Sequence, residues 1–245
     1  MELSFVVAAP DVQGTDATAY KGPISPFFKK LKELGYRGVE LMVRNPKELD
    51  FVELQAWLRD NDLEVALVNT GRVALEDDLH LMKPPGAERD RARDRICEII
   101  DFAAAISQPP PHPFGPQINA GLLRGQVHSG QDAGAARGWV VENLRYVAEY
   151  AARCGVRIAL EPINRYQSNF VNTAEEAVDL AREVGTGNIG IQMDVFHMNI
   201  EERSLAGSLI RNRDWITHIH VCDTNRRAPG QGHLATRGTS RPSWT

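Results

Sequence analysis

Short runs of apolar residues alternate with longer amphipathic stretches along most of the chain. Near-continuous apolar runs of this length are typical of strands buried on both faces. That environment is found in a parallel sheet that is covered by helices. The seven strands predicted on this basis are Leu3–Ala9, Gly38–Val43, Glu64–Asn69, Pro116–Leu123, Val156–Pro162, Asn188–Asp194 and Thr217–Asp223.

The stretches between the apolar runs carry signals for helix starts and stops. Asp50 is in position to cap a helix that extends to Asn61. Thr173 and Glu176 form a T-x-x-E capping box, and the periodic run that follows them stops at Gly185. The other helices predicted from apolar periodicity are Pro26–Gly35, Glu88–Ile106 and Gly138–Gly155.

The repeated order of strand and helix leaves few α/β folds open. No G-x-G-x-x-G follows the first strand and no G-x-x-x-x-G-K-[ST] occurs, which disfavours dinucleotide-binding and P-loop folds. Short, evenly distributed strands in 245 residues fit a (β/α)₈ TIM barrel, for which roughly 250 residues are typical. We therefore predict one α/β barrel domain in residues 1–233 and an irregular tail in residues 234–245.

Composition and charge restrict the class of partner. The chain is 42% hydrophobic and 24% charged with a net charge of −4, so nothing indicates binding to nucleic acid or to an anionic membrane. Three cysteines without a C-x-x-C pair fit reduced thiols. The first residues do not resemble a signal peptide, and no apolar run approaches the ~20 residues of a membrane span. We therefore expect a soluble, cytoplasmic protein.

Three late strands end in polar groups. Glu161 follows the fifth strand, Asp194 ends the sixth, and the seventh carries His218 and His220. In a TIM barrel the carboxyl ends of the strands form the functional face, so these side chains are expected to converge. Two carboxylates and one imidazole suit Mn²⁺, Mg²⁺, Co²⁺ or Zn²⁺.

Each of these residues also has an ordinary structural explanation. A single Asp after a strand is usually a turn residue or a helix cap, and a single His in a strand is usually a core residue. Glu161 is harder to explain, because an unpaired charge at the edge of the core is costly. The pattern does not choose between His218 and His220, which lie on one face of their strand.

Three stretches resemble the motifs of one known family. They are LEPINRYQSNFVNTAEEA, MDVFHMNIEE and HIHVCDTNRRAPGQGH. Together they resemble the xylose-isomerase-like TIM barrels, in particular the D-tagatose and D-psicose 3-epimerases and the hydroxypyruvate isomerases. The resemblance runs from about Gly35 to His233, with 33 positions between Glu161 and Asp194 and 26 between Asp194 and His220.

The resemblance implies roles for individual residues. Glu161, Asp194 and His220 would bind a divalent metal, with Mn²⁺ as the first expectation. Glu161 would also be the catalytic acid/base, and His197 and Arg226 would contact the substrate. The implied reaction removes a proton beside the carbonyl of a sugar or small hydroxy-carbonyl compound, giving a cis-enediolate, and returns it to epimerise or isomerise the substrate.

The chain departs from the family pattern at two places. Gln167 stands where the 3-epimerases carry a substrate-contacting glutamate; its amide can still hydrogen-bond a hydroxyl. The family's fourth ligand, a glutamate at the end of strand eight, would lie beyond Thr245. We therefore expect a truncated or frameshifted barrel without strand eight, with weaker metal binding. Its open edges would favour a homo-oligomer.

Other functions remain open at this point. A non-catalytic metal-binding remnant and a dehydratase acting on an inosose-type polyol are compatible with the same motifs. An endonuclease IV-like nuclease is the least favoured, because it needs further histidines at earlier strand ends. Arg72 and Arg124 follow the third and fourth strands and are expected to occupy ordinary surface positions.

Overall fold

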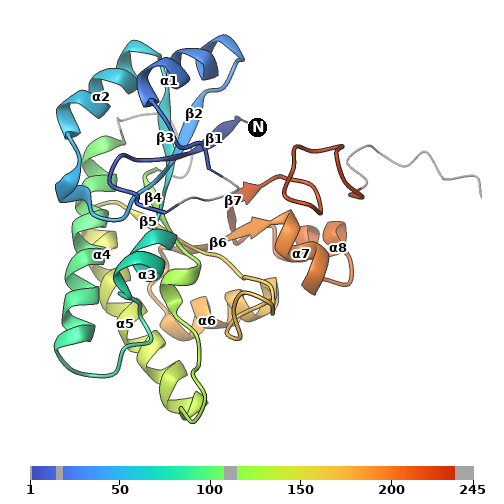
Figure 1. The fold of residues 1–245 in the computed structure, drawn as a ribbon. Coiled ribbons are helices and arrows are strands. Elements are labelled where there is room, and N and C mark those ends of the chain that lie inside the picture. The colour runs from blue at the N-terminus through green and yellow to red at the C-terminus, as the bar shows by residue number, and fades with distance from the viewer. Residues whose placement is uncertain (1, 15–18, 108–114, 235–245) are drawn as a thin grey trace, which may run out of the picture.

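A seven-stranded parallel sheet forms the centre of the molecule (Figure 1). The structure is a computed structural model that describes residues 2–14, 19–107 and 115–234. Neighbouring strands are paired in chain order from β1 to β7. The strands are β1 Ser4–Ala8, β2 Gly38–Met42, β3 Glu64–Asn69, β4 Gln117–Ala120, β5 Arg157–Leu160, β6 Ile189–Asp194 and β7 Ile216–His220. All seven predicted strands are thus confirmed, although β4 and β7 each end three residues earlier than predicted.

Helices connect the strands and lie outside the curved sheet, as Figure 1 shows for the long helices α4 and α5. The α-helices are α1 Ile24–Glu33, α2 Phe51–Asp60, α3 Gly71–Asp77, α4 Ala87–Ile106, α5 Ala133–Arg153, α6 Ala174–Val184, α7 Val195–Glu201 and α8 Leu205–Arg211. Two 3₁₀ turns add η1 Pro46–Glu48 and η2 Leu122–Arg124. The five predicted helices are confirmed, whereas α3, α7 and α8 were not predicted.

The predicted helix caps explain where several helices begin. Asp50 accepts a hydrogen bond from the backbone N–H of Glu53 at 2.9 Å. Thr173 and Glu176 bond to each other's backbone N–H, as a capping box requires. α5 begins five residues before the predicted start, because Asp132 caps it through the backbone N–H of Ala135.

The main core lies between the sheet and the helices. On α4 the buried side chains recur at helical spacing, for example Ile96, Ile99, Ile100 and Ala103, all 0% exposed. They pack in one cluster with the apolar side chains of the strands. Full burial of each isoleucine stabilises the fold by roughly 1.5–3 kcal/mol.

The sheet is curved enough to bring its two ends together across the interior. Glu40 on β2 lies within hydrogen-bond distance of His218 and His220 on β7. Within the described residues β1 and β7 are the edge strands and do not pair with each other. This is the arrangement predicted for a TIM barrel without strand eight. The predicted irregular tail lies outside the described residues, except for Leu234.

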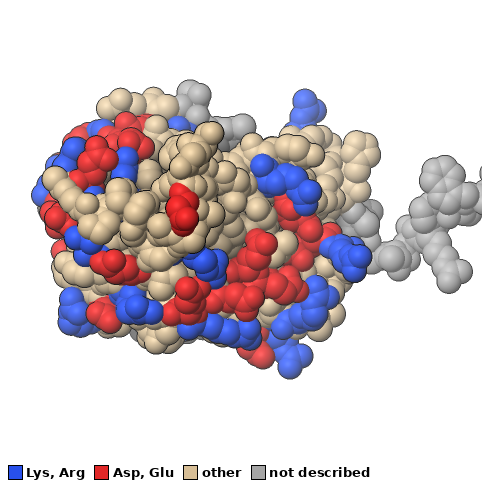
Figure 2. All heavy atoms as spheres, turned by 90° about the horizontal axis from the view of Figure 1, so that it is seen from below, with Lys and Arg blue, Asp and Glu red and all other residues tan. Residues whose placement is uncertain are grey.

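The surface carries both acidic and basic side chains, in agreement with the small net charge of the sequence. Acidic and basic side chains are interspersed on the face seen in Figure 2, without one continuous basic field. Among the described helices, none combines the length and the apolar character that crossing a membrane requires.

Close packing between β6 and β7 gives a test of the fold. A Cβ atom at Gly190 would lie 2.3 Å from Thr217 Cγ2 and 2.9 Å from the carbonyl oxygen of Trp215. Gly190→Ala should therefore lower the free energy of unfolding by about 1–3 kcal/mol, measured by urea denaturation. The matched control is Gly138→Ala in α5, where a Cβ meets nothing within 4 Å. This control should raise stability by roughly 0.5–1 kcal/mol. Equal stabilities of the two variants would contradict the close approach.

Candidate active site

Three adjacent strands bring Glu161, Asp194 and His220 to one point. Asp194 and His220 end β6 and β7 and are direct register partners, while Glu161 directly follows β5. His220 Nδ1 lies 3.7 Å from Glu161 Oε1 and 3.7 Å from Asp194 Oδ2. The structure thus brings together the three residues for which metal binding is predicted, while the role itself stays a prediction.

The donor set fits a divalent cation. Oxygen and imidazole ligands lie about 2.0–2.2 Å from an ion such as Zn²⁺, so two ligands of one ion are at most about 4.4 Å apart. The 3.7 Å separations of His220 Nδ1 from the two carboxylates meet this condition. Two oxygens and one imidazole nitrogen, without a thiolate, also suit Mn²⁺ and Co²⁺.

Both carboxylate oxygens of Asp194 accept hydrogen bonds, which hold the side chain in place. Its Oδ1 accepts from the backbone N–H of Phe196 at 2.8 Å, which caps α7, and its Oδ2 accepts from Arg226 Nη1 at 2.7 Å. Burial alone would raise the pKa of Asp194, but His220, Arg226 and His197 outweigh it and lower the pKa to about 2. Asp194 is therefore ionised at neutral pH.

Glu161 is in a different electrostatic environment. Its carboxyl group is buried, with Oε2 accepting from Asn119 Nδ2 at 2.9 Å. Burial raises the pKa of Glu161, and the negative charge of Asp194 adds to this, while His220 and Asn119 only partly oppose it. A carboxyl with a raised pKa is able to exchange protons closer to neutral pH.

His197 and Arg226 lie beside the two carboxylates. His197, on α7, is 4% exposed, and its Nδ1 lies 2.6 Å from Asn164 Nδ2. Its Nε2 lies 3.2 Å from Arg226 Nη2 and 3.8 Å from Asp194 Oδ2. A hydrogen-bond donor therefore faces each ring nitrogen, and the neutral ring accepts from one of the two. Arg226 also stacks over the Phe196 ring at 4.0 Å. Both predicted substrate contacts therefore lie at the same point as the predicted ligands.

Gln167 is not brought into this cluster. It lies in an exposed turn after β5, where its backbone N–H donates to the carbonyl of Asn164. Within the described residues its side chain makes no hydrogen bond. Its predicted contact with a substrate stays a prediction.

Glu40 is a member of the site that sequence reasoning missed. It lies in the middle of β2, is 0% exposed, and accepts from His220 Nε2 at 2.6 Å, His218 Nε2 at 3.1 Å and Asn69 Nδ2 at 2.8 Å. Burial alone would raise its pKa, but the two histidines hold the pKa well below its usual value. A glutamate inside the short apolar run GVELM was the available signal.

The positions of His218 and His220 show which of the two faces the other candidate metal ligands. Both rings contact Glu40, but His220 is the one whose second nitrogen also faces Glu161 and Asp194. Burial lowers the pKa of His220, but Glu40 and Asp194 outweigh it and hold the pKa well above its usual value. A metal ion would therefore have to displace a proton from this ring.

Arg124 corrects an expectation from the sequence. It was expected at the surface, but it is 0% exposed and donates to the carbonyls of Ala120, Glu161 and Phe170. Burial lowers its pKa to about 10. Its guanidinium thus ties the segment after β4 to the backbone of the candidate catalytic residue. Arg72 is 7% exposed, so its predicted surface position is also wrong.

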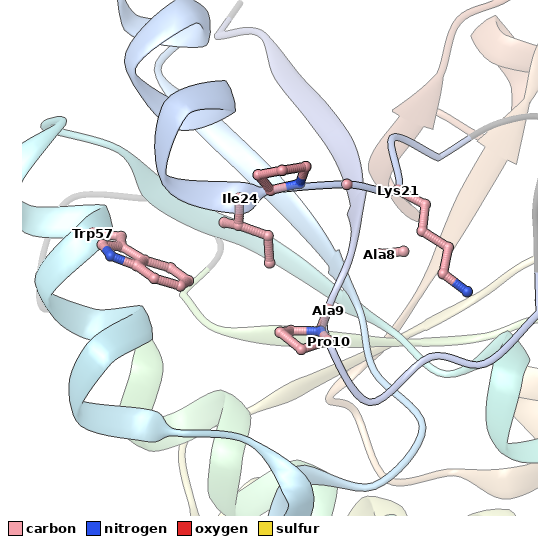
Figure 3. A pocket seen from close by; sticks show the side chains of 8 residues that line it. Ala8, Ala9, Pro10, Lys21, Ile24 and Trp57 are labelled. Atoms are coloured by element: carbon pink, nitrogen blue, oxygen red, sulfur yellow. The ribbon is translucent and has the colours of Figure 1, made fainter.

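A separate hollow of about 330 Å³ lies at the end of β1 (Figure 3). It is mainly apolar, with Trp57 of α2 on one side and Lys21 on the other. Its lining residues are Ala8, Ala9, Pro10, Lys21, Gly22, Pro23, Ile24 and Trp57. None of the candidate site residues lines this hollow, so it is distinct from the candidate site.

The fold and the site together define a TIM-barrel protein with a carboxylate and histidine cluster at the carboxyl ends of its strands. Residues 28–239 match the family described as the xylose isomerase-like TIM barrel, and the chain belongs to this family. The family resemblance of the three motifs is thereby confirmed.

Two relatives of this chain are named as an isomerase and an epimerase. Hydroxypyruvate isomerase of Escherichia coli K12 is 30% identical over 213 residues, which cover 84% of this chain and 77% of that enzyme. D-psicose 3-epimerase of Ruminiclostridium cellulolyticum is 40% identical over 94 residues, covering 38% of this chain. That match spans only about a third, 32%, of the relative's length.

A solved structure supports the fold. The D-psicose 3-epimerase of Clostridium cellulolyticum H10, determined with D-tagatose, superposes with a TM-score of 0.77 at 22% identity. The superposition covers 95% of this chain and 78% of that one.

Burial of neutral His197 predicts a pH dependence of stability. Burial, the largest influence, lowers the pKa of His197 to about 4 from a usual value of 6.5. Between these values the unfolded chain binds a proton that the folded chain does not. Stability should therefore fall as the pH drops from 6.5 to 4, by up to about 1.4 kcal/mol per pH unit from this group.

The comparison uses His197→Gln and the unaltered protein, both treated with chelator. Free energies of unfolding are measured in urea at several pH values between 7 and 4. The stability advantage of the unaltered protein should shrink as the pH falls, because only it has this ring to protonate. A constant difference across that range would contradict the buried, neutral state of His197.

Proposed function

We propose that this chain is a divalent-metal-dependent isomerase or epimerase acting on a ketose or a small hydroxy-carbonyl compound. One observation carries the proposal: buried Glu161, with a raised pKa, lies 3.7 Å from an imidazole that also faces ionised Asp194. The family and the named relatives support the same reaction class.

Glu161, Asp194 and His220 Nδ1 would hold the metal, for which we propose Mn²⁺. When bound, the metal would polarise the carbonyl and hydroxyl oxygens of the substrate. Three protein ligands are the number typical of a catalytic metal site, and the described residues would supply three.

Glu161 would move the proton. Its raised pKa lets it take a proton from the carbon beside the carbonyl, giving a cis-enediolate, and then return it. Asp194, with a pKa of about 2, is a poor proton carrier and is better suited to stay ionised. Among the described residues we propose Glu161 as the one proton carrier, and a single carrier on one face of the substrate suits transfer between neighbouring carbons, which is isomerisation. Epimerisation would need a second group on the opposite face.

His197 and Arg226 would bind the substrate's oxygens. His197 Nε2 lies 3.8 Å and Arg226 Nη1 lies 2.7 Å from Asp194 Oδ2, so both side chains border the proposed metal site. The guanidinium of Arg226 is a hydrogen-bond donor, and such donors stabilise negative charge that develops on an oxygen during proton removal. Gln167 would act only if the turn that carries it approached the substrate.

A first experiment tests metal binding. We expect the chelator-treated protein to bind about one Mn²⁺ per chain in calorimetric titration. Asp194→Asn can still cap α7. It should weaken Mn²⁺ binding by at least about 100-fold, because loss of a direct ligand weakens metal affinity at least as much as loss of a hydrogen-bond partner of a ligand. Asp101→Asn is the control, since Asp101 bonds to Tyr150 outside the site. Equal affinities of the Asp194 and Asp101 variants would exclude the proposed ligand set.

A second experiment tests the proton carrier. Hydroxypyruvate and D-psicose are incubated with Mn²⁺-loaded protein in D₂O, and exchange at the carbon beside the carbonyl is followed by NMR. Glu161→Gln should lower the exchange rate by about 10²–10⁴-fold, the usual contribution of an acid/base group. Glu98→Gln on the outside of α4 is the control. No exchange with the unaltered protein would favour the non-catalytic alternative.

A further inference from the structure

Glu40 is a buried carboxylate for which the proposed reaction has no use. It is 0% exposed in the middle of β2, and its carboxylate accepts from His220, His218 and Asn69. An uncharged side chain would occupy this interior position at lower cost, because removing a carboxylate from water is unfavourable. The residues that Glu40 contacts must therefore explain why a charged side chain is buried here.

The orientation of the His220 ring supplies that explanation. Nε2 lies 2.6 Å from Glu40 Oε2, whereas Nδ1 lies 3.7 Å from both Glu161 Oε1 and Asp194 Oδ2. A neutral imidazole has one donor and one acceptor nitrogen, and a carboxylate can only accept. The hydrogen of the neutral ring therefore belongs on Nε2, in the contact with Glu40. Once the proton on Nδ1 is displaced, the electron pair of Nδ1 is available to a metal ion beside Glu161 and Asp194.

We propose that Glu40 is a positioning residue that fixes the ring and the tautomer of His220, so that Nδ1 is the nitrogen offered to the metal. This inference rests on the proposed function and adds an outer contact to its metal site. Carboxylate–histidine–metal arrangements of this kind raise the basicity of the ligand and hold its orientation.

The neighbouring side chains are consistent with this assignment. Gln192 Nε2 lies 3.1 Å from Nδ1 and 3.2 Å from Nε2, so it does not select either nitrogen. The His218 ring stands edge-to-face against His220 at 5.3 Å and donates to the same Glu40 oxygen. Asn69 holds the other oxygen of Glu40 at 2.8 Å. The carboxylate is thus itself held in place from β3 and β7.

A different role for the same group is a second metal site. Ligand atoms of Glu40, His218 and His220 lie within 4.8 Å of one another. A metal there would take His220 Nε2, the nitrogen that is otherwise hydrogen-bonded to Glu40. The two roles differ in the number of ions bound and in the effect of removing the charge of Glu40.

The test is Co²⁺ titration of the chelator-treated full chain, followed by calorimetry and by the visible absorption of the bound ion. Glu40→Gln is nearly isosteric and Glu40→Met removes the buried charge altogether, a change that proteins often tolerate. Glu76→Gln is the matched control: Glu76 is another poorly exposed glutamate, bonded to the backbone of Gln13 and Gly14.

We expect one Co²⁺ per chain in the unaltered protein and in both Glu40 variants. The visible bands should keep their position in Glu40→Gln, because the ligands are unchanged, while the Kd rises about 10–100-fold. Glu40→Met should weaken binding at least as much, and Glu76→Gln should leave the Kd unchanged. In a His220→Ala background, Glu40→Gln should have no further effect, which distinguishes positioning from a general loss of stability.

The other outcomes overturn the inference in separable ways. Unchanged Co²⁺ affinity in both Glu40 variants would overturn the positioning role and leave the proposed function intact. Two ions in the unaltered protein and one in Glu40→Gln would replace it with a second metal site. No Co²⁺ bound by the unaltered protein would overturn the proposed function, and this inference with it.

Discussion

Three carboxyl groups surround a single imidazole at the mouth of the barrel. Glu40, Glu161 and Asp194 all lie within 4 Å of His220, and all three are nearly inaccessible to water. Three negative charges so close together in a poorly solvated space repel one another strongly. The arrangement is stable only because positive charge and hydrogen-bond donors are placed among them. This compensation governs the chemistry that the site can perform.

Positive charges and hydrogen-bond donors are distributed unequally around the carboxyl groups, and this gives the groups different pKa values. Asp194 faces His220, Arg226 and His197, which together outweigh its burial, so its pKa falls to about 2. Glu161 receives only one amide as a direct donor, so burial and the nearby negative charge raise its pKa. One carboxylate is thus suited to remain charged and another to exchange protons. Environments that push neighbouring pKa values apart are a general route to acid/base chemistry.

The same contacts join the site to the stability of the scaffold. Asp194 is both the cap of α7 and a candidate ligand. Arg124 ties the carbonyl of Glu161 to the segments after β4 and β5 through buried hydrogen bonds. A change at either residue therefore alters folding and function together. For this reason the variants that test chemistry here preserve capping or hydrogen bonding where the chain permits it.

Local pattern in the sequence determined the seven strands, the five longer helices and their caps, because these depend on neighbours a few residues apart. It also marked Glu161, Asp194 and the pair His218 and His220, since polar groups at the ends of buried strands stand out from the apolar runs before them. The family resemblance, not the local pattern, selected His220 from that pair. The seven-residue helices α3, α7 and α8 were missed because so short a stretch shows little periodicity. Only the tertiary structure decided that Glu40 and Arg124 belong to the site. Glu40 meets His218 and His220 because the curved sheet brings β2 against β7, and Arg124 meets the carbonyls of Glu161 and Phe170, which follow it by 37 and 46 residues.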